Sequence, residues 1–262
     1  MMTTNKELLL LRHGKSDWDV NTDDFDRPLK DRGKRGAQRL GVWMQQQGLI
    51  PDFILSSPAE RALTTAEKLC KSMGLATRDI YTDSRIYMAD SHTLKRIIRE
   101  CPTQAQRVLI VGHNPTLEDL LNELVDDSIK IPKDGKLLPT ATLAHLKLKG
   151  DFAQLTNHSA KLKNITRASS LDKGFPYIGL NGAEFKPRPA YYYNQSGVIP
   201  YCIIENELKF LLISTSSKNR WGLPKGIVEP AYTPQASAAK EAWEEAGVEG
   251  VVGDEALGRY TH

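Results

Sequence analysis

The chain has 262 residues, of which 40% are apolar and 26% are charged, and its formal net charge is +3. A charge this small and scattered argues against binding to a nucleic-acid polymer. No apolar run approaches the roughly 18 residues that a membrane span requires, and the polar start is unlike a secretory signal. Three cysteines without metal spacing, Cys70, Cys101 and Cys202, predict buried, reduced thiols in a cytoplasmic protein.

Short apolar runs and helical patterns alternate along the first 165 residues. Strands are expected at residues 8–11, 50–55 and 108–111 and within 78–88, and helices near 29–47, 57–72, 91–101 and 114–124. Ser57 and Pro58 are typical of the cap and the first position of a helix. Residues 141–148 alternate like an edge strand, and a turn at 150–151 predicts another strand at 152–155. The alternation predicts an α/β domain with a doubly wound, mostly parallel sheet.

The remaining third of the chain has a different character. Residues 168–195 are rich in Gly, Pro, Lys and Tyr, which indicates a partly extended linker. Two β-rich runs, 198–204 and 208–214, predict a hairpin, and a helix is expected over 234–246 with Gly247 as its stop. Val251, Val252 and Leu257 hint at further strands. We therefore expect a first domain at 1–165, a linker at 166–196 and a partial α+β domain at 197–262.

Cationic and imidazole side chains follow three of the predicted strands. Arg12 and His13 follow the first strand, Arg61 comes just after the second, and His113 follows the strand at 108–111. In open α/β sheets, ligands bind outside the carboxyl ends of the strands, so these four side chains should converge there. Two guanidinium groups and two imidazoles suit an anion, and phosphate is the obvious one.

The same residues resemble the signature of the histidine phosphatase superfamily: Arg12-His13-Gly14, an arginine after Ser-Ser-Pro (Arg61), and a histidine in Gly-His-Asn (His113). The run Arg-His-Gly-Lys-Ser-Asp-Trp and the later Asp-Arg-Pro-Leu are similar to the branch that includes protein phosphohistidine phosphatases. The resemblance implies that His13 attacks phosphorus while Arg12, Arg61 and His113 hold the phosphoryl oxygens, without a metal cofactor. Many relatives use a glutamate as proton donor, but residues 86–90 contain none. This absence favours phosphohistidine or another activated phosphate as the substrate.

Residues 226–248 resemble the Nudix hydrolase signature. Gly226, Glu241, Glu244, Glu245 and Gly247 occupy its positions, whereas Tyr232 and Lys240 replace a glutamate and an arginine. The three glutamates are spaced i, i+3 and i+4, so they share one helical face that a divalent cation would stabilise. The resemblance implies Mg²⁺ or Mn²⁺ held by Gly226, Glu241, Glu244 and Glu245. The alternative is a solvated acidic face, and the short segment after the helix predicts a truncated, weak or inactive second site.

Three functions remain open on the sequence alone. The first is a cytoplasmic phosphohydrolase that acts through phosphohistidine on a phosphorylated small molecule or a phosphohistidine protein, fused to an incomplete Nudix domain. In the second, both domains act in series on a nucleotide or pyrophosphate. In the third, the chain is a phosphate-binding regulatory module without turnover. A histidine in the nucleophile position counts against the third, because a pure binder needs no nucleophile.

Overall fold

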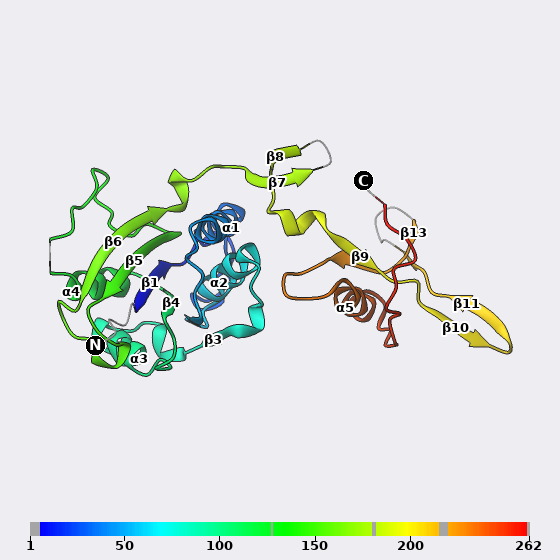
Figure 1. The fold of residues 1–262 in the computed structure, drawn as a ribbon, viewed down its shortest axis with the longest axis horizontal. Coiled ribbons are helices and arrows are strands. Elements are labelled where there is room, and N and C mark those ends of the chain that lie inside the picture. Colours follow the sequence, from blue (N-terminus) through cyan, green and yellow to red (C-terminus); the bar gives the residue numbers. More distant parts are fainter. Residues whose placement is uncertain (1–5, 127, 180–181, 215–219, 261–262) are drawn as a thin grey trace. The chain divides into compact units, whose positions relative to one another are not determined.

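The structure is a computed structural model, and it describes residues 6–126, 128–179, 182–214 and 220–260. The chain divides into two compact units, residues 1–175 and 176–262 (Figure 1). No helix in the described ranges is long and apolar enough to cross a membrane.

A six-stranded sheet forms the centre of the first unit, with the strand order β3-β2-β4-β1-β5-β6. Strands β3, β2, β4 and β1 are parallel to one another. At one edge of the sheet, β5 pairs antiparallel with β1, and β6 pairs antiparallel with β5. The doubly wound, mostly parallel sheet is therefore confirmed. The strands are β1 (Glu7–Arg12), β2 (Phe53–Ser56), β3 (Ile80–Thr82), β4 (Arg107–Gly112), β5 (Thr142–Leu148) and β6 (Ala160–Arg167). The helices are α1 (Asp31–Gln46), α2 (Glu60–Met73), α3 (Ser91–Arg99) and α4 (Thr116–Leu124).

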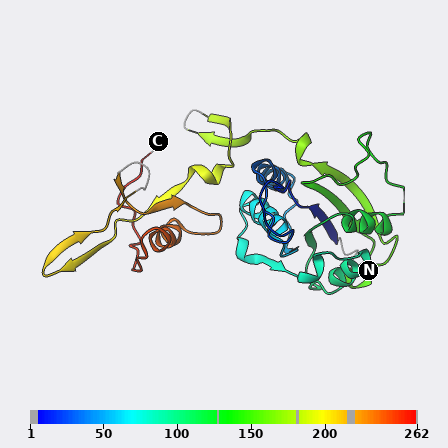
Figure 2. The ribbon, with the colours of Figure 1, turned by 180° about the vertical axis from the view of Figure 1, so that it is seen from behind.

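Alternate residues of the central strands supply two separate cores. Leu8 and Leu10 of β1 pack in one apolar cluster with α3 and α4, and Leu9 and Leu11 pack in the other with α1 and α2. All four leucines are fully buried. Figures 1 and 2 show α1 and α2 side by side against the sheet. Because successive side chains of a strand point to opposite faces, a continuous leucine run is what a strand covered on both faces requires.

Two local predictions for the first unit are wrong, and so is the predicted burial of one cysteine of the second unit. Residues 152–154 form a short 3₁₀ helix, and the strand that pairs with β5 is β6, further along the chain. Ser57 does not cap α2, because the helix begins at Glu60 after Ala59; Arg61 nevertheless lies in its first turn. Cys70 and Cys101 are buried as expected, but Cys202 of the second unit is exposed.

The second unit consists of short antiparallel strand pairs and one helix. Its strands are β7 (Phe175–Gly179), β8 (Gly182–Lys186), β9 (Gln195–Gly197), β10 (Tyr201–Ile204), β11 (Glu207–Phe210), β12 (Ile213–Ser214), β13 (Trp221–Gly222) and β14 (Lys225–Ile227). β7 and β8 pair within the segment that was expected to be a linker.

The hairpin and the helix predicted for the second unit are confirmed, and the further strands after the helix are not. The hairpin is β10–β11, which turns through Glu205 and Asn206, both at positive φ. Helix α5 (Pro234–Ala246) ends at Gly247 in the left-handed conformation, and it packs on the β9–β14 pair. Val251, Val252 and Leu257 lie within residues 248–260, which form no strand.

Candidate active site

Three neighbouring strands of the first unit end at the same edge of the sheet. β4 lies between β2 and β1, and the register pairs Arg12 with Gly112 and Ser56 with Val111. His13, Ser57 and His113 each follow directly on one of these strands. The parallel sheet thus brings together the four side chains that the sequence singles out, with Arg61 supplied by the first turn of α2.

The His13 ring is fixed by the backbone next to it. Its Nδ1 lies 2.7 Å from the carbonyl oxygen of Gly14. Because a carbonyl only accepts, Nδ1 carries the proton and Nε2 keeps its lone pair. Gly14 is itself held by its N–H, which donates to Thr65 Oγ1 at 2.9 Å. A Cβ at Gly14 would lie 2.7 Å from the carbonyl oxygen of Gly33, so only glycine allows α1 this close.

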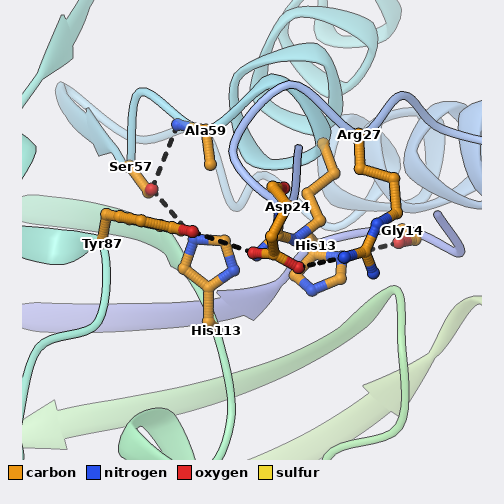
Figure 3. A network of polar contacts seen from close by, with 9 residues as sticks. His13, Gly14, Asp24, Arg27, Ser57, Ala59, Tyr87 and His113 are labelled. Carbon is orange, nitrogen blue, oxygen red and sulfur yellow. Dashed lines mark hydrogen bonds and ion pairs between the residues drawn. The ribbon is translucent and has the colours of Figure 1, made fainter. Parts of the chain in front are cut away.

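The second imidazole is oriented by a serine. His113 Nε2 lies 2.9 Å from Ser57 Oγ, which also accepts the N–H of Ala59 at 3.3 Å (Figure 3). If the hydroxyl donates to Nε2, the ring proton lies on Nδ1. That Nδ1 is buried and has no hydrogen-bond partner in the described part of the chain. The centroids of the His13 and His113 rings are 5.1 Å apart, so His113 can present a hydrogen-bond donor close to His13.

The two arginines differ in how they are held. Arg12 donates from one terminal nitrogen to the carbonyl of Leu138 at 2.8 Å, while its Nε is buried and has no partner among the described residues. Arg61 is buried, and both of its terminal nitrogens contact Asp24: one the backbone carbonyl, the other the carboxylate at 2.8 Å. Among the described residues, Arg12 Nε and His113 Nδ1 of this site are therefore buried nitrogens without a partner, and they are available to an anion.

Sequence reasoning missed Asp24 and Tyr87. The Asp24 carboxylate accepts from Arg61, from Arg27 and, at 2.9 Å, from the Tyr87 hydroxyl (Figure 3). Tyr87 in turn lies edge-on to His113, with ring centroids 5.7 Å apart. Asp24 is one of several aspartates in a polar loop, and no spacing distinguishes it from the others. The sequence predicts Ser57 only as a helix cap, whereas the structure places it against His113.

Burial and charge keep both imidazoles neutral. Burial is the main cause that lowers the pKa of His13 from 6.5 to about 3, and the neighbouring His113, Arg61 and Arg12 each lower it further, against the opposing effect of the Gly14 carbonyl. Burial and the charges of Arg61 and Arg12 lower the pKa of His113 to about 4, although Asp24 opposes the shift. The His13 ring is therefore neutral at pH 7, with its one proton on Nδ1 and a free lone pair on Nε2, the state that nucleophilic attack requires.

These shifts predict an unusual pH profile. A histidine nucleophile of ordinary pKa would lose activity as the pH falls through 6.5, because the protonated ring cannot attack. With its folded-state pKa near 3, His13 should stay reactive, so kcat/KM for p-nitrophenyl phosphate should be nearly constant between about pH 8 and pH 5.5. A pH series of initial rates measures this. An acid limb centred near pH 6.5 would contradict the lowered pKa.

The residues of the Nudix-like signature lie where β14 meets α5. Gly226 is in β14, and a Cβ there would lie 2.0 Å from the carboxyl carbon of Glu241, so glycine lets that carboxylate approach the strand. Glu245 accepts the N–H of Lys225 at 3.1 Å, whereas Glu244 pairs with Lys240 at 3.0 Å. Burial and the nearby charges of Glu244, Glu245 and Glu229 raise the pKa of Glu241.

A bound cation would relieve the repulsion among these carboxylates. Within the described ranges, however, no three His, Cys, Asp or Glu side chains are close enough to hold one metal ion. The metal site therefore stays a prediction.

Comparisons with known proteins divide the chain into the same two parts as the structure does. Residues 8–86 match the histidine phosphatase superfamily (branch 1), and residues 195–262 match the NUDIX domain. An uncharacterised protein of Mycobacterium tuberculosis is 30% identical over 156 residues, which are 58% of this chain and 96% of that protein. A 2,3-bisphosphoglycerate-dependent phosphoglycerate mutase of Mycobacterium leprae is 42% identical over 62 residues, or 22% of this chain and 25% of the mutase.

Solved structures match the first unit. A protein of Agrobacterium tumefaciens assigned as the phosphohistidine phosphatase SixA is 28% identical, with a TM-score of 0.52 over 62% of this chain and 98% of that one. The protein histidine phosphatase SixA complexed with tungstate has a TM-score of 0.54 over 63% of this chain and 99% of its own; at 19% identity it shows the fold alone.

The fold and the site define a phosphatase-type α/β domain with histidine and arginine side chains at the ends of its parallel strands. The chain belongs to the histidine phosphatase superfamily, branch 1, and carries a NUDIX domain over residues 195–262. The family and its structural neighbours support a phosphatase activity for the first unit.

Proposed function

We propose that the first unit hydrolyses a phosphorylated substrate through a phosphohistidine intermediate on His13, and that its substrate is phosphohistidine in a protein. The observation that carries the proposal is the state of the His13 ring. Its Nδ1–H is held by the Gly14 carbonyl, which leaves the lone pair of Nε2 free beside two arginines and a second histidine. A phosphate-binding module would need the cations but not this arrangement.

The first chemical step is an in-line displacement. The lone pair of His13 Nε2 forms a bond to phosphorus while the bond to the leaving group breaks, and the leaving group keeps that electron pair. Arg12 Nε–H is a buried donor without a partner among the described residues, and it can serve the phosphoryl oxygens. His113 Nδ1 is buried and unpartnered as well, and it can donate in the tautomer in which Ser57 donates to Nε2. Donors that are already positioned and dehydrated stabilise the charge of the transition state at little cost in reorganisation.

The second step hydrolyses the phosphohistidine intermediate and regenerates the free enzyme. A water molecule attacks phosphorus, the bond between phosphorus and Nε2 breaks, and its electron pair returns to the His13 ring. Inorganic phosphate leaves, and the proton lost by the water passes to solvent or to the phosphate. His13 is then neutral again, in agreement with its lowered pKa.

The choice of phosphohistidine depends on the leaving group. In phosphohistidine the leaving group is the imidazole of the substrate. When the ring nitrogen that is not bonded to phosphorus carries a proton, this imidazole departs as a neutral molecule and needs no further proton. The alkoxide that leaves a sugar phosphate, in contrast, needs a strong general acid. Residues 86–90 contain no glutamate, and Asp24 is ionised because Tyr87 and two arginines lower its pKa, although burial alone would raise it. The site is therefore suited to a leaving group that needs little acid assistance.

A substrate comparison tests this proposal. The full chain should turn over a phosphohistidine peptide with a kcat/KM about a hundredfold above that of glucose 6-phosphate, the usual size of a general-acid contribution. Faster turnover of the sugar phosphate would contradict it.

For the second unit we propose that Gly226, Glu241 and Glu245 hold Mg²⁺, or Mn²⁺, with Glu244 joining if it leaves Lys240. The same assays run with and without Mg²⁺ test this. The first site should ignore the metal, and any diphosphate hydrolysis by the second should require it.

A further inference from the structure

The contacts of Asp24 have a consequence for the free protein. Arg61 is one of the two arginines expected to hold the phosphoryl group, yet both of its terminal nitrogens are bonded to this one residue. The Asp24 carboxylate also forms an ion pair with Arg27 and accepts a hydrogen bond from the hydroxyl of Tyr87. In Figure 3 it lies at the centre of the polar network, between His113 and the side chains of His13 and Arg27.

An anion in this position opposes a second anion. The pKa of Asp24 is lowered by Tyr87, Arg61 and Arg27, so the carboxylate is charged at neutral pH. A phosphoryl group that approaches Arg61 meets an arginine whose charge is already matched, and it is repelled by the carboxylate itself. Phosphate can gain the full attraction of Arg61 only when Asp24 moves away.

The Asp24 side chain can turn away from Arg61 without any movement of the loop that carries it. Its base is closed by backbone hydrogen bonds, from Asp17 N–H to the Pro28 carbonyl at 2.8 Å and from Lys30 N–H to the Lys15 carbonyl at 2.9 Å. Between these anchors the backbone forms no helix or strand, and the Asp24 side chain is 47% exposed. The backbone at the tip is held too, because the Phe25 carbonyl accepts the N–H of Glu60 at 3.0 Å. The half-exposed carboxylate can therefore leave Arg61 by rotation of the Asp24 side chain while the loop stays in place.

We infer that Asp24 is an internal competitor of the substrate: in the free protein it occupies Arg61 in place of the phosphoryl group, and it must be displaced before phosphate binds fully. This inference rests on the phosphatase site proposed above. The opposite reading is that Asp24 holds Arg61 in the orientation that phosphate needs. The two readings predict opposite signs for the same substitution.

The test is the Kd of inorganic phosphate, measured by calorimetry on the full chain for the wild type, Asp24→Asn and Asp23→Asn. Asparagine keeps the shape of the side chain and removes its charge, so phosphate should bind Asp24→Asn about tenfold more tightly. Asp23→Asn, which removes the same charge from the exposed neighbour in the loop, should change the Kd less than twofold, within the range of a screened surface charge. Equal or weaker binding by Asp24→Asn, or an equal gain in Asp23→Asn, would overturn the inference.

A second variant tests the same inference if Asp24→Asn fails to fold. Tyr87→Phe leaves the charge of Asp24 in place and removes one of the hydrogen bonds that hold it. It should tighten phosphate binding by a smaller factor, about threefold, and a weaker affinity would count against the competitor. Because the readout is binding rather than turnover, these results stand apart from the assays of phosphohistidine hydrolysis.

Discussion

Replacing His13 with alanine should abolish turnover of every substrate of the first unit, while inorganic phosphate still binds. The substitution removes the only atom that forms the covalent intermediate, and it leaves Arg12, Arg61 and His113 to hold the anion. We expect kcat to fall by about a thousandfold or more, as in other enzymes that lose their nucleophile. The Kd of phosphate should change by less than about threefold, because neutral His13 adds little attraction.

The measurement combines steady-state rates with a chemical trap. After rapid quenching at alkaline pH, where phosphohistidine survives, mass spectrometry should find the phosphoryl group on the peptide that contains His13 in the wild type. His92→Ala, a substitution of an exposed histidine on α3, is the matched control and should keep wild-type rates. Undiminished turnover in His13→Ala would refute the covalent mechanism. If this variant lost phosphate binding together with turnover, the result would indicate a damaged fold.

The parts of the fold that the sequence predicts are those decided by local patterns. The leucine run in β1 and the valine-rich run in β4 are buried on both faces, so their composition is informative by itself. The antiparallel edge is different. Residues 152–155 have the polarity of a strand, but Asp151 accepts the N–H of Ala153 and starts a 3₁₀ turn, and β6 then pairs with β5 from further along the chain.

The same distinction applies to the site. Arg12, His13 and His113 adjoin strands, so the rule that ligands bind at carboxyl ends places them correctly. Ser57 follows a strand too, but its partner is the ring of His113, 56 positions later, and only the register of β2 with β4 brings the two together. Asp24 and Tyr87 come from loops whose paths depend on tertiary contacts, such as the edge-on packing of Phe25 against Tyr87 at 5.1 Å. No sequence period encodes such contacts.

Replacing Arg61 with alanine should cause the second large loss. The guanidinium is buried in the first turn of α2, where it carries the full positive charge expected to face the phosphoryl oxygens. We expect kcat/KM to fall by about a thousandfold, which is the usual result of removing a buried donor of this kind. Arg61→Lys should recover only part of the loss, since an ammonium group lacks the planar fork. Arg35→Ala, at an exposed position of α1, is the control.

The same arginine decides how Asp24 acts. If Asp24 competes for Arg61, its removal should help phosphate only while Arg61 is present. The tenfold gain in affinity expected of Asp24→Asn should therefore shrink to about twofold or less when it is measured in the Arg61→Ala background, which corresponds to a coupling free energy of about 1 kcal/mol. A gain of equal size in both backgrounds would show instead that the carboxylate repels phosphate through space and that Arg61 plays no part. The double-mutant cycle thus separates displacement at one arginine from a general effect of charge.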